Sequence, residues 1–499
     1  MKKQNTIIIG SGLAALQCGY ILSKQGMNVC ILEKNAHPGG CLQTFSRGAH
    51  KFDTGFHYVG ALDEGQPLHR LFKYFNLLDL PWHRLDDAMF DEIIIEGKSY
   101  PFATGYDRFA ETLSTHFPHQ KKNLQKYASF LRQVSDHIFD IFTKHPQEDV
   151  YGTSLFSTPA YDYLTATIDD PLLRNVLSGA SLKMELNPRT LPLYVFAQIN
   201  SSYIQSAWRL KGGGSQIADS LVQSIRANGG TVRLKSEVTR LIEKNGKIAA
   251  AEINGQELIE ADYFIADTHP TVALSLIKES RLIRNIYRKR INNLENTFGM
   301  FTANIALKEN ALPYQNRNIY IYKTRNVWQY ADYRPENINT CALISFHPPT
   351  DASPFTRNID ILTPMYWPEV AQWSETKSGR RGDDYISYKT LKAEACLHLA
   401  APHIPCLKDT PLKNAIEKIY TSTSLTYRDY TATPQGSAYG LRKIHNQLLT
   451  TLLSPRTPEP NLFLTGQNLN LHGLLGVSIT SFLTCAEIIG MKTEIEELI

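Results

Sequence analysis

The chain has 499 residues, of which 42% are hydrophobic and 20% are charged, with a formal net charge of +4. This composition is typical of a folded globular protein and excludes an intrinsically disordered chain. Lys and Arg are scattered along the sequence, so the composition does not indicate a nucleic-acid partner. At roughly 150 residues per domain, the length allows about three domains or two interleaved ones.

Cysteine usage and hydropathy further narrow the class of protein. The seven cysteines contain no C-x-x-C pair, and they are Cys18, Cys30, Cys41, Cys341, Cys396, Cys406 and Cys485. We therefore expect no disulfide framework and no metal site, and we expect most cysteines to be small buried residues in a reducing compartment. No apolar run is long enough to predict a transmembrane helix. The expected location is cytoplasmic, with at most a peripheral contact to a membrane.

The first forty residues predict a nucleotide-binding βαβ unit. A strand over 6–9 leads into Gly10-Ser11-Gly12-Leu13-Ala14-Ala15, a helix over 13–24 and a second strand over 28–32 that ends at Glu33. Gly10 permits the tight turn, Gly12 lets the backbone approach a pyrophosphate, and Ala15 lets the helix pack on the strand. The helix N-terminus favours a diphosphate, and Glu33 favours a ribose with a free 2′-hydroxyl, as in FAD or NAD.

A secretory signal peptide is the alternative for this segment, because Lys2 and Lys3 precede an apolar run through Leu22. Glycines interrupt the run, however, and no clear cleavage site follows it. Gln17 also stands before Cys18, where a lipoprotein signal requires a small residue. We therefore favour the nucleotide site.

The next elements alternate between strands and helices. Residues 93–102 predict a hairpin that turns at Glu96-Gly97. From about residue 107 the pattern is helical, with one amphipathic face formed by Leu124, Tyr127, Leu131, Val134, Ile138 and Phe142. We expect this face to pack in a core. Asp170 and Pro171 predict the start of another helix, over 172–177.

A glycine run at 212–214 ends this helical insertion, and a βα alternation resumes. It comprises a helix over 217–227, strands over 231–234 and 237–242, a turn at Asn245-Gly246 and a buried strand over 261–267. Strands over 298–307, 319–322, 341–346 and 359–365, with a helix over 385–400, predict a mixed sheet of a second domain. A last strand over 461–465 feeds a helix over 477–489, which Gly473 and Gly476 open.

Further glycine elements separate this chain from proteins that bind only NAD. Gly39-Gly40 follows Glu33 closely, and the N-terminal motif 52–58 comes next. Four later stretches complete the pattern, namely 211–215, 425–430, 434–440 and 464–473. Together these stretches resemble the FAD-dependent carotenoid desaturase, carotenoid isomerase and retinol saturase family, within the amine-oxidase-like flavoproteins. The resemblance spans nearly the whole chain.

The resemblance implies an α/β fold in which a Rossmann-like FAD-binding domain with a parallel sheet is interleaved with a substrate domain of mixed sheet and helices. The FAD-binding domain is expected in three parts, 1–106, 204–290 and 426–499. Residues 107–203 are expected to form a helical cap over the substrate, and residues 291–425 the substrate sheet.

The resemblance also implies which residues hold FAD. They are Gly10, Ser11, Gly12, Leu13, Ala14, Glu33, Lys34, Gly39, Gly40, Cys41, Leu42, Val238, Gly466, Gln467, Leu475, Gly476 and Val477. The last three would place a helix N-terminus at the pyrimidine edge of the flavin, where reduction creates negative charge. Two residues depart from the family pattern, because Cys41 stands where many relatives have Arg and Gln467 replaces a common acidic residue.

The implied activity is that of an oxidoreductase or isomerase at conjugated C=C bonds of a hydrophobic isoprenoid or polyene, with hydride transfer through flavin N5. Saturation additionally needs a proton donor, and His57, His472 and Tyr439 are the candidates. The structural alternatives are a hydrogen-bonded histidine for His57 and pocket lining for His472 and Tyr439.

Two other functions stay open at this point. One is a flavin amine oxidase on the same scaffold, and the other is a flavin- or lipid-binding protein without turnover. No second complete nucleotide motif is visible, so electrons are expected to pass to or from a quinone, oxygen or a transient partner. If a polyene is the substrate, we expect the insertion over 107–203 to face a membrane surface.

Overall fold

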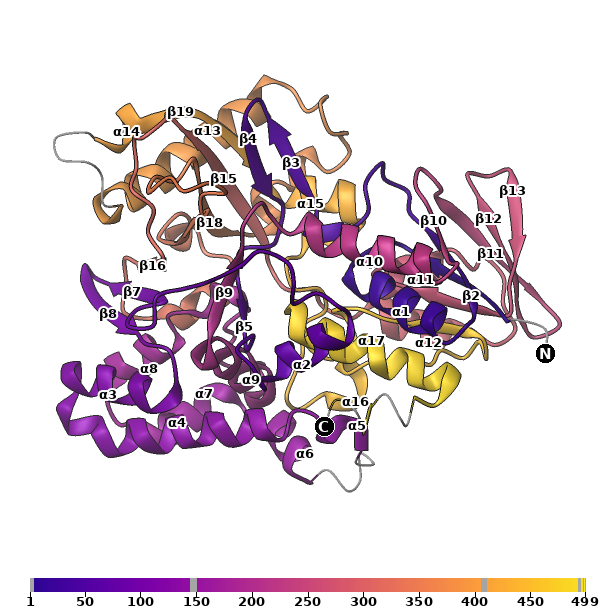
Figure 1. The fold of residues 1–499 in the computed structure, drawn as a ribbon, viewed down its shortest axis with the longest axis horizontal. Helices are drawn as coiled ribbons and strands as arrows, with labels where there is room; N and C mark the ends of the chain where they lie inside the picture. Colours follow the sequence, from indigo (N-terminus) through magenta and orange to yellow (C-terminus); the bar gives the residue numbers. More distant parts are fainter. Residues whose placement is uncertain (1–3, 144–149, 405–410, 492–494, 497, 499) are drawn as a thin grey trace.

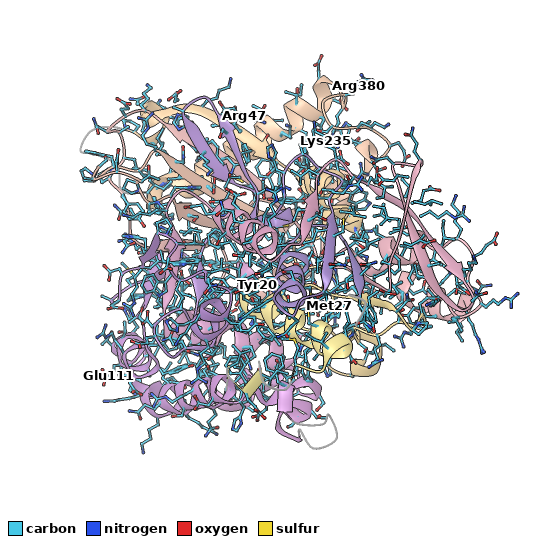
Figure 2. The ribbon with its side chains drawn as sticks, turned by 45° about the vertical axis from the view of Figure 1, so that its right-hand side comes forward. Tyr20, Met27, Arg47, Glu111, Lys235 and Arg380 are labelled. Atoms are coloured by element: carbon cyan, nitrogen blue, oxygen red, sulfur yellow. The ribbon has the colours of Figure 1, made fainter. Side chains whose placement is uncertain are left out.

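The computed structural model describes residues 4–143, 150–404, 411–491, 495, 496 and 498, and Cys406 lies outside these residues. Figure 1 shows three regions: a nucleotide-type domain on the right, a large sheet at the upper left and a helical cap at the lower left. Charged side chains such as Glu111 and Arg380 project from the surface, as Figure 2 shows.

A five-stranded parallel sheet forms the centre of the right-hand domain. Its order is β10 (Thr231–Arg233), β2 (Asn28–Leu32), β1 (Asn5–Ile9), β14 (Tyr263–Ala266) and β20 (Leu462–Leu464). The predicted strands over 6–9, 28–32, 261–267 and 461–465 are therefore confirmed, with small shifts at their ends. Segments from both ends of the chain thus meet in one sheet.

Helices cover one face of this sheet, and strands and helices cover the other. Helix α1 (Leu13–Lys24) packs against α10 (Ser215–Ala227) and α17 (Gly473–Ile489) on the first face. The second face carries β11 (Val238–Lys244), β12 (Lys247–Ile253) and β13 (Glu257–Glu260), with α11 (Pro270–Ser275) and α12 (Asn285–Asn292). The alternating buried side chains of β1 explain this two-sided burial, because Ile8 joins the first core and Ile7 and Ile9 the second.

The second large sheet has seven strands and is mixed. Its order is β19 (Ile416–Ser422), β15 (Gly299–Leu307), β18 (Asn358–Met365), β17 (Cys341–Phe346), β16 (Asn318–Tyr322), β7 (Asp91–Ile95) and β8 (Lys98–Phe102). Only the β16–β7 pair is parallel among these described strands. Helix α13 (Asp383–Ala400) covers one face. The predicted hairpin over 93–102 is confirmed, and it extends the sheet.

The cap covers the opposite face of the seven-stranded sheet (Figure 1). Its helices are α3 (Tyr106–His116), α4 (Lys121–Asp136), α5 (Asp140–Thr143), α6 (Val150–Ser157), α7 (Ala160–Thr167), α8 (Pro171–Ser178) and α9 (Leu193–Gln205). Asp170 caps α8 as predicted, since its carboxylate accepts from Leu172 N at 2.7 Å. The prediction of one amphipathic face that reaches Phe142 is wrong in one respect. Helix α4 ends at Asp136, and Phe142 packs in the core beside α17.

The remaining elements connect these regions. They are α2 (Pro67–Tyr74), α14 (Leu412–Ala415), α15 (Ser424–Thr431), α16 (Leu448–Thr451), the hairpin β3 (Thr44–Arg47) and β4 (His50–Asp53), and the small sheet of β5 (Val59–Gly60), β9 (Ala207–Leu210) and β6 (Trp82–Arg84). Among the described residues, no helix combines the length and apolarity that a bilayer span requires.

Candidate nucleotide and substrate site

The turn between β1 and α1 has the geometry that its glycines predict. Gly10 has a φ of 91°, and a Cβ there would lie 2.9 Å from the carbonyl oxygen of Asp267. Gly12 is the N-cap of α1 and offers no side chain to cap it. The first-turn N–H groups of α1 therefore depend on neighbouring segments or a ligand for partners.

Glu33 is buried at the carboxyl end of β2, beside this turn. Its carboxylate accepts from Ser11 N at 3.0 Å, Ser11 Oγ at 2.6 Å and Asn35 N at 2.7 Å. The acid is thus held rigidly next to the glycine turn, in the position that the sequence predicted for a ribose contact.

The second glycine pair lies directly against the first turn. Gly39 N donates to Ser11 O at 2.8 Å, and a Cβ on Gly40 would lie 3.3 Å from Gly12 Cα. Beyond the pair, Cys41 is exposed and Leu42 is buried in the core that contains α1. The structure therefore brings the two glycine elements into direct contact.

Val238 and Lys34 reach the same region from other segments. Val238 begins β11 and is buried, and Ser236, two residues earlier, donates its N–H to Glu33 O at 2.8 Å. Lys34 extends in another direction, since its Nζ donates to Asp429 O at 3.4 Å.

The C-terminal motif completes this side of the site. Gly466 follows β20 with a φ of 92°, and a Cβ there would lie 3.9 Å from Ala14 Cβ, at the start of α1. Helix α17 begins at Gly473 rather than at 477, and Leu475, Gly476 and Val477 lie in its first turns. His472 is its N-cap but makes no side-chain capping bond. The polar N-terminus of α17 is therefore available to a ligand.

Asp267 is a residue of this site that the sequence did not single out. Its carboxylate accepts from Ala15 N at 3.0 Å, in the first turn of α1. Its two oxygens lie 2.4 and 2.5 Å from where Cβ atoms on Gly12 and Gly466 would stand. Desolvation and, to a lesser extent, the charge of Glu33 raise the pKa of Asp267 to about 6, against the hydrogen bond from Ala15 N, which lowers it. A half-buried acid thus stands where the sequence predicts a diphosphate.

His472 and Tyr439, two of the three candidates for a proton donor, lie together. Their ring centres are 4.7 Å apart. His472 Nε2 donates to Lys183 O at 2.9 Å, and Tyr439 Oη donates to Leu182 O. Both side chains line a cavity of about 30 Å³ with Met184. Burial lowers the pKa of His472 to about 4, so its ring is neutral at neutral pH.

His57 faces a different cluster. Its Nδ1 lies 3.7 Å from Asp360 Oδ2 and makes no hydrogen bond, while His347 Nε2 contacts the same oxygen at 2.7 Å. Burial lowers the pKa of His57 to about 4. Nearby Asp53 accepts from Gly214 N at 2.7 Å, which fixes the glycine run. His57 therefore carries an unused buried nitrogen rather than a charge.

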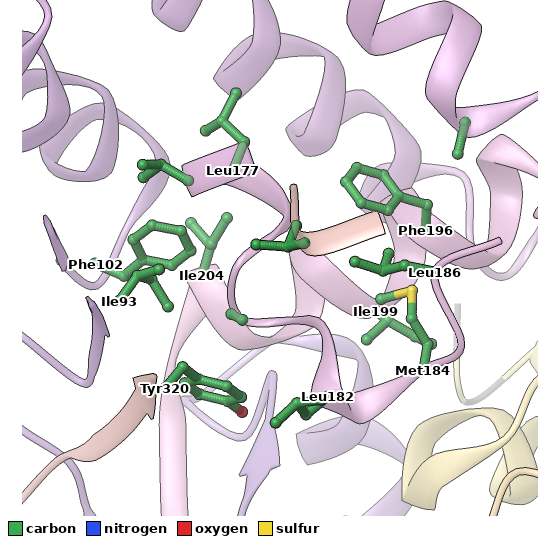
Figure 3. Packing of buried hydrophobic residues seen from close by; sticks show 14 of the residues in the cluster. Ile93, Phe102, Leu177, Leu182, Met184, Leu186, Phe196, Ile199, Ile204 and Tyr320 are labelled. Atoms are coloured by element: carbon green, nitrogen blue, oxygen red, sulfur yellow. The ribbon is translucent and has the colours of Figure 1, made fainter. Parts of the chain in front are cut away.

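The interface between the cap and the seven-stranded sheet is a large apolar core. Figure 3 shows part of it, in which Leu182, Met184 and Leu186 lie close to Phe196, Ile199 and Tyr320. The same core includes Leu471 of the C-terminal motif, and Tyr439 packs against it. An apolar interior thus runs from the cap to the N-terminus of α17.

The ammonium group of Lys183 lies inside this core, and no pattern in the sequence predicted its burial. Lys183 Nζ donates to Tyr58 Oη at 2.9 Å and to Asp91 Oδ2 at 3.3 Å. It also lies 3.8 Å from the ring centre of Tyr203. Burial lowers the pKa of Lys183 to about 8, although Asp91 favours the charged form.

Comparisons with known proteins agree with this geometry. A family profile described as an NAD(P)-binding Rossmann-like domain matches residues 8–75. The all-trans-retinol 13,14-reductase of Homo sapiens is 26% identical over 98% of this chain and 86% of its own length. A 4,4′-diapophytoene desaturase of Methylomonas sp is 27% identical over 53% of this chain and 55% of its own.

The chain is thus similar over nearly its whole length to retinol reductases, and over about half of it to a carotenoid desaturase and to prolycopene isomerases. A solved structure of putrescine oxidase, bound to putrescine, shares the fold with a TM-score of 0.65 at 14% identity, covering 98% of this chain and 99% of that one.

Proposed function

We propose that this protein is an FAD-dependent oxidoreductase or isomerase that acts on conjugated C=C bonds of a hydrophobic isoprenoid or polyene. The observation that carries the proposal is the apolar interior between the cap and the seven-stranded sheet, which reaches Leu471 and Tyr439 beside the N-terminus of α17. The named activities of the retinol reductases and the desaturase among its relatives support the same class.

The residues around α1 fit a flavin nucleotide. Cβ atoms on Gly10, Gly12 or Gly466 would clash with atoms of Asp267, so only glycine lets these turns approach each other closely at the N-terminus of α1. Glu33 offers carboxylate oxygens for ribose hydroxyls, and the α1 N-terminus offers N–H groups for a diphosphate. The other predicted contacts, Ser11, Leu13, Ala14, Lys34, Gly39, Gly40, Cys41, Leu42, Val238 and Gln467, belong to the same proposal.

When bound, FAD supplies hydride transfer through its N5 atom. The residues of this chain would orient the cofactor and the substrate, and they would exclude water from the site. The N-terminus of α17 would stabilise negative charge at the pyrimidine edge, through Leu475, Gly476 and Val477. Apolar side chains such as Met184, Leu191 and Val195 line the cavity beside His472 and Tyr439, and they would hold a polyene there by burial of its apolar surface, since a polyene offers no hydrogen bonds.

Proton supply is the step that separates saturation from the other reactions. His57 and His472 are neutral at neutral pH, and burial raises the pKa of Tyr439. Each can still donate a proton, but none is a strong acid. The ammonium group of Lys183 has a pKa of about 8, which is closer to neutral pH. Its carbonyl oxygen accepts from His472, and that of the neighbouring Leu182 accepts from Tyr439. We therefore add Lys183 to the three candidates.

An amine oxidase is the second candidate function, because putrescine oxidase shares the fold. Lys183 argues against it. The aromatic side chains Tyr58, Tyr203 and Tyr320, which could surround an amine, already surround the ammonium group of Lys183. A protonated amine entering there would meet a like charge, which disfavours binding. Electron exchange with a quinone or oxygen remains part of the proposal.

The visible spectrum of the purified protein tests the cofactor. We expect flavin absorption bands and FAD, rather than FMN, in the supernatant after heat denaturation. A colourless protein that takes up no added FAD would refute the proposal. If flavin is bound but neither dithionite nor a quinone changes its redox state, the binding protein without turnover becomes the correct description.

A further inference from the structure

A basic surface on the nucleotide domain lies outside the site described above. It comprises the first six residues of α12 and the segment before them, residues 278–290, and we call it the 278–290 surface. Its cationic residues are Lys278, Arg281, Arg284, Arg288, Lys289 and Arg290, against a single acid, Glu279. Five of the six cationic residues are exposed, and Arg288 is half-buried. This concentration contrasts with a formal charge of only +4 for the whole chain.

Large apolar side chains project from the same surface. Ile286 is 78% exposed, the highest value among the exposed large hydrophobic side chains of the described residues, and Leu282 is 38% exposed. A single exposed apolar side chain is common on protein surfaces and needs no explanation. Exposing two of them within one cationic cluster costs hydrophobic free energy and does need an explanation. The pattern is that of an interfacial segment with apolar and basic residues.

The surface is held in place from beneath. Ile283 and Ile291 are fully buried in the core of the nucleotide domain. Arg288 donates to Leu274 O at 2.7 Å and to Ile277 O at 2.5 Å. At about 100° per residue, Ile286 lies about 140° around the helix from Ile291. The packing of Ile291 therefore directs Ile286 outward.

The cap is less suited to such a contact. In its described part, Tyr161 is the one exposed large hydrophobic side chain, at 38%. The expectation that the insertion over 107–203 faces a membrane thus has weaker support than the 278–290 surface offers. Charge complementarity decides the occupant, because cationic side chains around an apolar tip match an anionic lipid headgroup layer.

We propose that the 278–290 surface docks the protein on an anionic lipid bilayer, with Ile286 and Leu282 entering the headgroup region. This docking is independent of the reaction catalysed. Each cation near an anionic membrane strengthens binding about fivefold, and salt weakens the attraction. The nucleotide domain, not only the substrate entrance, would then hold the enzyme at the membrane.

Co-sedimentation of the full chain with vesicles tests this directly. Vesicles of phosphatidylcholine alone are compared with vesicles that also contain phosphatidylserine, at low and high salt. We expect binding to the anionic vesicles only, and a decrease with salt. The double variant Arg284→Gln/Lys289→Gln should weaken binding roughly 25-fold, and Ile286→Ser should also weaken it.

Helix α13 provides a matched control. Ile386 and Leu391 are 57% and 67% exposed but lie outside the basic cluster, so Ile386→Ser/Leu391→Ser should bind as the unchanged protein does. Thermal unfolding checks that every variant is folded. Equal binding to both vesicle types, no binding to either, or unchanged binding of the α12 variants overturns the proposal. Capture of an acidic protein without vesicle binding would assign the surface to a protein partner instead.

Discussion

Lys183 and Asp91 form an ion pair in the interface between the cap and the seven-stranded sheet, with Nζ 3.3 Å from Oδ2 and side chains that are 8% and 0% exposed. Asp91 also accepts from Tyr58 Oη at 2.8 Å and from Asn318 Nδ2 at 2.7 Å. Because Lys183 comes from the cap and Asp91 from β7, the pair joins the two layers that enclose the proposed substrate space.

Replacing Lys183 with Met should destabilise the fold by about 3 kcal/mol, because it leaves Asp91 buried without its cation. The double variant Lys183→Met/Asp91→Asn should recover much of the loss, since both charges are then gone. Denaturant unfolding of the two single variants and the double variant measures the coupling. A single-variant loss below about 1 kcal/mol would show that the pair is not important for packing the cap.

Asp267 should make nucleotide binding depend on pH. Binding a diphosphate beside this acid favours its protonated form, so affinity should fall as the pH rises through its pKa of about 6. Asp267→Asn removes the charge but keeps an oxygen for Ala15 N. We expect FAD binding about tenfold tighter at pH 8, and nearly independent of pH, by quenching of FAD fluorescence.

Asp262 supplies the control for this prediction. It lies just before β14, the strand that Asp267 follows. It is exposed and accepts from Asn5 N at 2.8 Å. Asp262→Asn should leave FAD affinity and its pH dependence unchanged. If Asp267→Asn binds FAD as the unchanged protein does at every pH, Asp267 does not oppose the diphosphate.

Glu33→Gln should weaken FAD binding by about tenfold, because the amide is a poorer partner for ribose hydroxyls and for Ser11 N and Oγ. Titration calorimetry with FAD provides the affinity. Titration with FMN, which lacks the adenosine, controls for effects elsewhere in the site. A variant with unaltered FAD affinity would contradict the ribose role of Glu33.

The buried histidines should make the protein sensitive to acid. Burial lowers the pKa values of His57 and His472 from 6.5 to about 4. Between pH 4 and pH 6.5 the unfolded chain therefore binds more protons than the folded protein. Their contribution to stability is complete above pH 6.5 and is lost as the pH falls through 4, at most roughly 3 kcal/mol each. His57→Gln should reduce the slope of unfolding free energy against pH in this window. Denaturant melts at several pH values measure the slope, and an unaltered slope would contradict the shift.

The sequence predicts the parts of this protein that rest on local patterns. The βαβ unit with Gly10, Gly12 and Glu33 follows from strand and helix periodicity and turn chemistry, and the structure places its elements as expected. The same holds for the Asp170 cap and the hairpin at Glu96-Gly97. In each case the deciding contacts lie within a few residues.

Long-range contacts account for what the sequence missed. Asp267 meets Ala15 across 252 positions and Lys183 meets Asp91 across 92, so no spacing rule could pair them. The hairpin of β7 and β8 joins the seven-stranded sheet through β16, which only the tertiary fold decides. The approach of His57 to Asp360, across 303 positions, is a further example.

Anaerobic flavin spectroscopy with a polyene tests the central claim most directly. The FAD-loaded protein, oxidised or reduced with dithionite, is mixed with all-trans-retinol, with a carotene or with putrescine, and the flavin bands and the products are recorded. We predict that a polyene bleaches the oxidised flavin, reoxidises the reduced flavin or is isomerised, while putrescine causes no change. Bleaching of the oxidised flavin by putrescine, with every polyene recovered unaltered, would contradict the account.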